Sequence, residues 1–315
     1  MKSTVFLCFI VCVVVYSQDV IAQKRAKNPF IKHIYTADPS AHVWKDNRLY
    51  VYPSQDIYPP KGCDLMDRYH VFSTSNMVKW KDHGEILNSK QLSWGRPEGG
   101  FMWAPDCAYK NKTYYFYFPH PSGTDWNNTW KIGVASSKKP DRDFKDMGYI
   151  KGLGGFAMID PCVFVDDDGQ AYMIYGGGSK CYGGKLKDNM IELDGEMREM
   201  VGLVDFHEGA WLFKRKGIYY LMYSDNTKIE NKMRYTMSQN PLGPWEHKGV
   251  MLEGTGCDTS HGSVVEYKGK WYLFYHNKSI SGKGNLRSIC FDSLSFNEDG
   301  SMNTVIQTGK NIESK

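Results

Sequence analysis

Five short stretches of the chain share one pattern, in which Tyr, Trp and Phe alternate with aliphatic residues and almost no charge interrupts them. Runs of this kind predict buried β-strands. Each stretch follows a turn signal such as Asp-Asp-Gly at 167–169 or Lys-Gly at 268–269, so each is the second arm of a hairpin. The stretches are 48–52, 113–117, 170–175, 218–223 and 270–275.

The spacing of these stretches indicates a repeat of about fifty residues. A repeat of that length with several short strands is typical of a β-propeller, whose four-stranded blades bury their faces against one another. Segments 78–84, 143–148 and 243–249 each combine an aromatic residue, charges and a turn glycine, which fits outer strands. The sequence therefore predicts an all-β, five-bladed propeller with a central funnel, rather than an irregular β-sandwich.

Composition supports one large β domain. The 315 residues are 41% hydrophobic and 14% aromatic, and the 31 glycines are spread along the chain, as expected for many short strands joined by tight turns. The formal net charge is +4, but the basic residues are scattered and form no stripe interleaved with aromatic residues. We therefore expect no nucleic-acid partner.

The N-terminus has the pattern of an export signal. Lys2 precedes an apolar run at 5–16, and small residues stand before position 23. The run is too short to span a bilayer. We expect residues 1–22 to be a signal peptide, residues 23–315 to form the propeller, and the mature protein to be secreted or periplasmic without membrane insertion. Of the remaining cysteines, Cys107, Cys162 and Cys290 lie in strand-like runs and are expected to be buried thiols.

The repeat phase also aligns a set of chemically active residues. The residue eleven or twelve positions before the third residue of each stretch is, in chain order, Asp38, Trp103, Asp160, Glu208 or His261. These positions begin the innermost strand of each blade, at the mouth of the central channel. Any one acid would be more typical of a solvated surface site. Three acids at one phase predict a shared site.

Inverting glycoside hydrolysis needs such a set. One carboxylic acid protonates the leaving oxygen, and a carboxylate about 6.5–9.5 Å away activates water on the opposite face of the sugar. Opposed blades of a narrow ring can supply that gap. A third carboxylate near the acid would keep it protonated through like-charge repulsion. Trp103 would offer an apolar face to a sugar, although packing between blades explains it equally well.

The motifs around these acids resemble glycoside hydrolase family 43, whose members are five-bladed propellers acting on xylan and arabinan side chains or oligosaccharides. The likeness covers nearly the whole mature chain. The motifs are Tyr-Thr-Ala-Asp-Pro-Ser at 35–40, Ile-Asp-Pro-Cys at 159–162 and His-Glu-Gly-Ala-Trp at 207–211. The resemblance implies that Asp38 is the general base, Asp160 the modulator of the pKa of the acid and Glu208 the general acid.

Weaker matches imply further site residues. Met-Trp-Ala-Pro-Asp at 102–106 is similar to the family's substrate-stacking motif, which implies a sugar contact for Trp103. Arg287 resembles an arginine that reaches sugar hydroxyls. His261 resembles the position where many members hold a calcium ion, mostly through water. A structural Ca²⁺ at the channel centre and a His261 that only hydrogen-bonds to a catalytic acid both stay open.

Three further features of the sequence give a weaker indication of the substrate site. His42, near the base, is a candidate for lining the sugar subsite, but it can equally be a packing residue. The chain departs from the family pattern at 95–100 and at 257–260, which lengthens the approaches to Trp103 and His261. These departures reshape the pocket mouth and weaken any transfer of substrate specificity from the family.

The resemblance favours an exo-acting hydrolase that removes one terminal pentose from an oligosaccharide or polysaccharide and needs no cofactor for its chemistry. We expect a β-xylosidase acting on xylan-derived oligosaccharides. An α-L-arabinofuranosidase is the near alternative because the two pentoses differ little in shape, and an arabinan-degrading enzyme is the next. A non-catalytic carbohydrate-binding propeller is the alternative of another class, since fold alone does not fix function.

Overall fold

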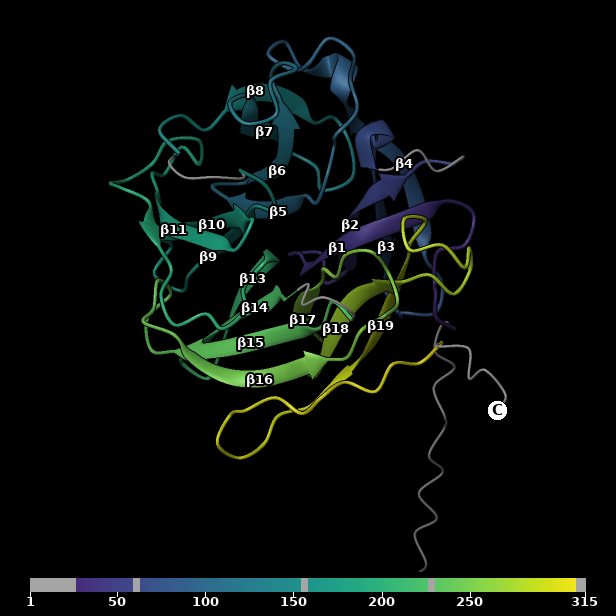
Figure 1. The fold of residues 1–315 in the computed structure, drawn as a ribbon, viewed down its shortest axis with the longest axis vertical. Helices are drawn as coiled ribbons and strands as arrows, with labels where there is room; N and C mark the ends of the chain where they lie inside the picture. Colours follow the sequence, from purple (N-terminus) through teal and green to yellow (C-terminus); the bar gives the residue numbers. More distant parts are fainter. Residues whose placement is uncertain (1–26, 59–62, 154–157, 226–229, 310–315) are drawn as a thin grey trace, which may run out of the picture.

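The computed structural model describes residues 27–58, 63–153, 158–225 and 230–309. The expected signal peptide at 1–22 lies outside the described residues. Five antiparallel sheets are arranged around a central axis, with the first strand of each sheet facing the centre (Figure 1). The prediction of an all-β, five-bladed propeller is confirmed.

The blades follow one another along the chain, four with four strands and the last with three. The first two blades are β1 (Tyr35–Val43), β2 (Leu49–Asp56), β3 (Arg68–Thr74), β4 (Lys81–Asn88), and β5 (Asp106–Lys110), β6 (Thr113–Pro121), β7 (Trp130–Ser137), β8 (Lys145–Tyr149). The third and fourth are β9 (Cys162–Val165), β10 (Ala171–Gly177), β11 (Lys180–Leu186), β12 (Arg198–Glu199), and β13 (Glu208–Arg215), β14 (Ile218–Ser224), β15 (Met233–Ser238), β16 (Glu246–Leu252). The fifth is β17 (Ser263–Tyr267), β18 (Lys270–Asn277) and β19 (Ser288–Leu294), and two short 3₁₀ helices, η1 (Cys63–Leu65) and η2 (Ser89–Gln91), interrupt the loops.

The aromatic stretches form the second strand of every blade, as their pattern predicts. These strands are buried on both faces, because neighbouring blades cover them from either side. The predicted outer strands at 78–84, 143–148 and 243–249 overlap β4, β8 and β16, whose residues are largely exposed or half-buried. Strand order in each blade thus follows the hydrophobic pattern of the sequence.

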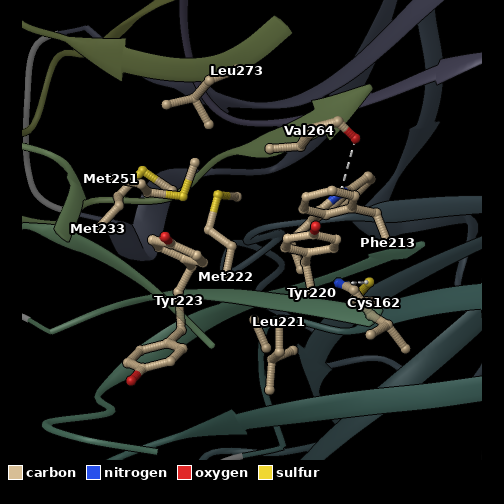
Figure 2. Close-up of a cluster of buried hydrophobic side chains, with 14 of the residues drawn as sticks. Cys162, Phe213, Tyr220, Leu221, Met222, Tyr223, Met233, Met251, Val264 and Leu273 are labelled. Atoms are coloured by element: carbon tan, nitrogen blue, oxygen red, sulfur yellow. Dashed lines mark hydrogen bonds between the residues drawn. The ribbon is translucent and has the colours of Figure 1, made fainter. Parts of the chain in front are cut away.

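The hydrophobic core is divided into clusters that lie between adjacent blades. One cluster joins the third, fourth and fifth blades, and Figure 2 shows Cys162, Tyr220, Met222 and Leu273 within it. Further clusters join the first blade to the second, the second to the third, and the fifth to the first. Each blade is therefore stabilised by its neighbours, which is the expected consequence of a repeat that cannot bury its own faces.

The ring closes without a covalent link between the first and last blades. The chain ahead of β1 runs beside β19, where Phe30 donates a backbone hydrogen bond to Ile289 (3.2 Å). At the start of β1, Thr36 donates one to Arg287, directly before β19 (2.9 Å). All cysteines from Cys63 onward are free thiols, and the three expected to be buried are buried. Within the described ranges, no helix is long and apolar enough to cross a membrane.

Candidate active site

A pocket of about 290 Å³ lies where the innermost strands of the blades begin. All five blades contribute to its wall. Its lining residues are Asp38, Asp56, Cys63, Met66, Trp103, Ala104, Ile159, Asp160, Glu208, Asp258, Thr259, His261, Gly284, Asn285 and Arg287. The repeat phase therefore brings the three predicted acids, Trp103 and His261 into one cavity, and the chain adds Arg287 from the loop before β19.

Irregular backbone aims the acids into this pocket. Asp38 and Asp160 have positive φ angles of 50° and 53°, a conformation that costs a residue with a side chain on the order of 1–3 kcal/mol. The register of β1 on β2 shifts at Asp38, and the register of β13 on β14 shifts directly after Glu208. Such bulges re-aim side chains beside active sites. A proline follows each aspartate, and its missing N–H leaves no ladder donor unpaired.

Asp38 is held as a carboxylate. Its Oδ1 accepts a hydrogen bond from Nη1 of Arg287 (2.9 Å), and its Oδ2 accepts one from the Ser54 hydroxyl (2.5 Å). Burial by itself would raise the pKa of Asp38, but the Arg287 charge and, to a smaller extent, the Ser54 hydrogen bond lower it below the ordinary value. Asp38 therefore stays ionised under mildly acidic conditions, as a general base must.

Arg287 is itself fixed by Asp56. Its Nε and Nη2 donate to the two carboxylate oxygens of Asp56 at 2.9 and 2.8 Å, a bidentate arrangement that orients the guanidinium plane. Nη1 donates to Asp38 and also to the Thr259 hydroxyl, at 2.8 Å. Arg287 lines the pocket, but here its donors bind protein oxygens. A contact between Arg287 and a sugar hydroxyl stays a prediction.

His276 completes the surroundings of the base. The backbone N–H of Asp38 donates to Nδ1 of His276 (3.1 Å), and Nε2 of the same ring lies 2.9 Å from the carbonyl oxygen of Thr259. Nε2 therefore carries the proton. Burial, assisted by the Arg287 charge, lowers the pKa of His276 to about 4. The neutral ring accepts the hydrogen bond from the Asp38 backbone and carries no charge at neutral pH.

Asp160 and Glu208 have the opposite electrostatic setting. Asp160 is buried, and its Oδ2 accepts a hydrogen bond from the Gly209 backbone (2.8 Å). Burial, together with the negative charges of Glu208 and Asp38, raises the pKa of Asp160 well above its ordinary value. Interacting carboxyls titrate as a pair. The Asp160–Glu208 pair therefore retains a proton at a pH where Asp38 has lost its own, and Glu208 faces the pocket.

Comparison with known proteins agrees with this geometry. The family model described as "Glycosyl hydrolases family 43" matches residues 26–302. The chain belongs to glycoside hydrolase family 43. It is 35% identical to xylosidase/arabinosidase 43A of Humicola insolens, over 88% of this chain and 98% of that protein. As a member of this family, it is a glycosidase.

Solved structures of family 43 enzymes share the fold. A β-xylosidase/α-arabinofuranosidase from a compost microbial metagenome, in complex with xylotriose in a calcium-free form, superposes with a TM-score of 0.79 at 34% identity, covering 89% of this chain and 97% of that one. A Xanthomonas citri enzyme complexed with xylotriose gives a TM-score of 0.82 at 31% identity, covering 91% and 96%. The five-bladed architecture is thus that of family 43 enzymes.

Trp103 forms part of the pocket wall of this family 43 chain. Its indole N–H donates to the carbonyl oxygen of Cys63 (3.0 Å), which ties the ring to the loop between β2 and β3 of the first blade. His261 lines the pocket beside the acid pair, with Nδ1 3.8 Å from Oδ2 of Asp160. Burial lowers the pKa of His261, so the ring is neutral at neutral pH. Trp103 presents an apolar surface and His261 a polar one.

His42 does not join these residues. It lies in a separate cavity of about 510 Å³ that is lined by the innermost strands of all five blades. Its Nε2 is 2.8 Å from Oδ1 of the buried Asp106, and its ring stacks on Trp44 with the ring centres 4.8 Å apart. His42 is absent from the pocket of the three acids, so a role for it in the sugar subsite has no geometric support. Alternation alone would place residues 38 and 42 on one face, but the register shift between Ala37 and Ser40 breaks that alternation. The packing alternative fits.

Sequence reasoning missed the residues that set the state of the base, namely Ser54, Asp56 and His276. A signal for two of them was present. Ser54 and His276 lie four residues after the reference tyrosines Tyr50 and Tyr272, so they lie near the ends of the second strands of their blades at one repeat phase. The pairing of Asp56 with Arg287 had no comparable signal, because 231 residues separate the partners.

The donor set does not form a calcium cage. Calcium takes six to eight oxygen ligands. Among the residues that the structure describes, no three His, Cys, Asp or Glu side chains are placed to share one metal ion. His261 offers a single imidazole nitrogen, which is a poor donor for calcium. The side chains present therefore do not fit direct coordination of Ca²⁺, and we assign the chemistry to the carboxyl groups.

Proposed function

We propose that this family 43 enzyme is an exo-acting β-xylosidase that removes terminal xylose from xylan-derived oligosaccharides with inversion at the anomeric carbon. The observation that carries the proposal is that one small pocket holds an ionised carboxylate, Asp38, and a carboxyl pair that retains a proton, Asp160 with Glu208. Inverting hydrolysis needs these two protonation states at the same pH.

Each group has a defined task in the proposed reaction. Asp38 accepts a proton from a water molecule as the water oxygen attacks the anomeric carbon. Glu208 donates a proton to the glycosidic oxygen as its bond to that carbon breaks. Asp160 lies beside Glu208 and disfavours its ionisation before the reaction. The net result is one water consumed, and Asp38 ends protonated while the acid pair ends ionised, until solvent exchange resets both.

Pocket size supports exo action. A volume of about 290 Å³ is at the lower end for ligand pockets and suits one small sugar ring better than the middle of a chain. The Xanthomonas citri enzyme, which shares the fold over most of both chains, was crystallised with xylotriose. Both observations favour a xylo-oligosaccharide that enters by its non-reducing end.

An α-L-arabinofuranosidase is the second candidate, because the Humicola insolens relative carries both xylosidase and arabinosidase in its name. Xylose and arabinose are isomeric pentoses of equal size, and small differences in the placement of hydroxyl or methylene groups change binding by only a few kcal/mol in a pocket of this kind. Dual activity therefore fits the same residues.

The test is a substrate panel with product stereochemistry. The purified enzyme is assayed on the 4-nitrophenyl β-D-xyloside, α-L-arabinofuranoside and β-D-galactoside, and the anomer of xylose first released from the xyloside is followed by ¹H NMR. We expect turnover of the xyloside above the other two and initial release of α-xylose. Initial release of β-xylose would rule out inversion. Sugar binding without turnover of any substrate would favour the non-catalytic alternative.

We further propose that the protein is exported. The support is the N-terminal pattern alone, with a basic residue, an apolar run and small residues before position 23. N-terminal sequencing of the protein recovered from the periplasm or medium of an expressing bacterium tests it. A mature chain that begins near Gln23 is expected, and an uncleaved cytoplasmic chain would contradict the proposal.

A further inference from the structure

An aromatic cluster extends from the pocket wall to the surface of the second blade. It consists of Phe101, Trp103, Trp126 and Trp130. Trp130 is buried and contacts the other three, with ring-centre distances of 6.0 Å to Phe101, 4.5 Å to Trp103 and 5.3 Å to Trp126. Phe101, Trp103 and Trp126 also contact one another at 5.8 Å. Three rings thus rest on one buried ring.

Exposure increases along this cluster away from the pocket. Trp103 lines the pocket, whereas Trp126 does not and leaves 53% of its surface exposed. Single exposed aromatic residues are common on protein surfaces. Trp126 differs because it continues an apolar wall that starts at the catalytic acids. A ligand that extends out of the pocket on this side would meet Trp103 first and Trp126 next.

The turn that carries Trp126 is tied down by hydrogen bonds. The Asp125 carboxylate accepts from the Asn127 backbone (3.0 Å) and from the Asn128 side chain (2.7 Å), and Ser122 donates its backbone N–H to Thr129 (2.8 Å). The indole is therefore presented to solvent by an ordered turn. Ordering the residue before a ligand arrives reduces the entropy lost on binding.

The segment that carries Phe101 is strained and tightly packed. Phe101 has a φ of 57°, which is unusual for a bulky residue. It follows Gly100, where a β-carbon would lie 1.9 Å from the carbonyl oxygen of Asp64, so only glycine fits. The Arg96 guanidinium covers Phe101 at 5.0 Å. Strain of this kind persists where surrounding contacts impose it, and it clusters at binding sites. Phe101 directly follows residues 95–100, one of the two segments where the sequence departs from the family pattern.

We infer that Phe101, Trp103 and Trp126 form a binding site for the sugars on the leaving-group side of the scissile bond, and that Trp126 contacts a sugar beyond the one next to that bond. The faces of the three rings are inclined to one another by 57° to 68°, so they form a cradle, not a flat platform. The C–H bonds of a pyranose face carry partial positive charge and are attracted to the negative face of an indole ring.

This inference rests on the proposed function and narrows it. The pocket holds the terminal pentose, and the aromatic cradle selects for a longer β-1,4-linked xylan fragment behind it. The enzyme should therefore prefer xylotriose and xylotetraose to xylobiose. An aryl xyloside has only a single ring as leaving group, which reaches Trp103 but extends less far toward Trp126.

The test compares chain-length dependence in Trp126→Ala, Trp126→Phe and Ile306→Ala. Ile306 is 85% exposed beside the fourth blade and serves as a remote apolar control. We measure kcat/KM on xylobiose, xylotriose, xylotetraose and 4-nitrophenyl xyloside. Trp126→Ala should lower kcat/KM for xylotetraose by about three- to tenfold, the range expected for loss of one aromatic contact, with a smaller loss on the aryl xyloside. Trp126→Phe should retain most of the preference.

Two results would overturn the inference. One is a chain-length preference that Trp126→Ala leaves undiminished, and the other is an equal loss on the aryl xyloside and on xylotetraose. A wild-type enzyme that hydrolyses no xyloside would instead refute the proposed function. In that case calorimetry separates the two ideas, because xylotetraose should still bind Glu208→Ala protein more tightly with Trp126 than with Ala at that position.

Discussion

The two sides of the pocket contain the same functional group in opposite states. On the first-blade side, Asp38 is surrounded by a guanidinium, a hydroxyl and a neutral imidazole, and its pKa falls. On the opposite side, burial and the Glu208 charge raise the pKa of Asp160. Both aspartates are 5% exposed and both follow the same Asp-Pro pattern. Burial and local sequence therefore do not separate their roles.

What separates them is the charge brought in from elsewhere in the chain. Asp38 forms an ion pair with Arg287, which lies in the loop before β19 and is held by hydrogen bonds to Asp56. Asp160 is close to the negative charge of Glu208, which belongs to the next blade. One partner is a cation and the other an anion, and this sign decides which carboxyl loses its proton first. Both partners reach one cavity, Glu208 from the start of the innermost strand of its blade and Arg287 from the loop before β19.

The largest expected effect comes from Glu208→Ala. Loss of the proton donor should lower kcat on xylobiose by about 10² to 10⁴-fold, the usual contribution of a general acid. Activated aryl xylosides should suffer much less, because their leaving groups need little protonation. Steady-state rates on both substrate types check this expectation.

Asp38→Asn is the matched variant on the other side of the pocket. It should reduce rates on sugar and aryl leaving groups alike, since both need an activated water. Equal losses on both substrates for Glu208→Ala would contradict its assignment as the acid, and a leaving-group dependence for Asp38→Asn would reverse the two roles.

The fold was predictable because its signal repeats. Five aromatic stretches at regular spacing define the blades, and the same register brings Asp38, Asp160 and Glu208 to the pocket. Of the two interpretations of His42, the geometry fits packing, because closeness in sequence to Asp38 does not fix the face of the strand and the His42 side chain lies with Asp106 in the other cavity.

The electrostatic assignment was less predictable. Asp56 and Arg287 are brought into contact by the closure of the ring between the first and last blades. No local sequence pattern predicts a contact between residues 231 positions apart. The inclined rings of Phe101 and Trp126 likewise depend on two connections, namely the loop before β5, where Phe101 has a positive φ, and the turn between β6 and β7. Repeats predict positions along a strand, whereas loop contacts require the structure.

Asp160→Asn should have the next largest effect and sharpens the acid side of the comparison. Without this carboxyl, Glu208 ionises more easily, so the alkaline limb of the pH dependence of kcat/KM should move down by about one unit or more. The acid limb, which follows Asp38, should move less. Rate profiles between pH 4 and pH 9 measure both limbs. An unmoved alkaline limb would remove Asp160 from its role as modulator, and Asp168→Asn on the exposed turn after β9 controls for loss of a remote charge.

The smallest expected effect is that of Ser54→Ala on the base side. The Ser54 hydroxyl donates to Oδ2 of Asp38 at 2.5 Å and helps to hold the pKa of Asp38 below its ordinary value. A hydrogen bond of this kind contributes about 1 kcal/mol and a unit of pKa corresponds to about 1.4 kcal/mol, so the acid limb should rise by about half a unit to one unit. The alkaline limb should stay in place, because the Ser54 hydroxyl donates its proton to Asp38 and not to the acid pair. An acid limb that fails to rise, or an alkaline limb that moves with it, would mean that Asp38 and the pair do not titrate as separate sites, and the contrast between the two sides of the pocket would be lost.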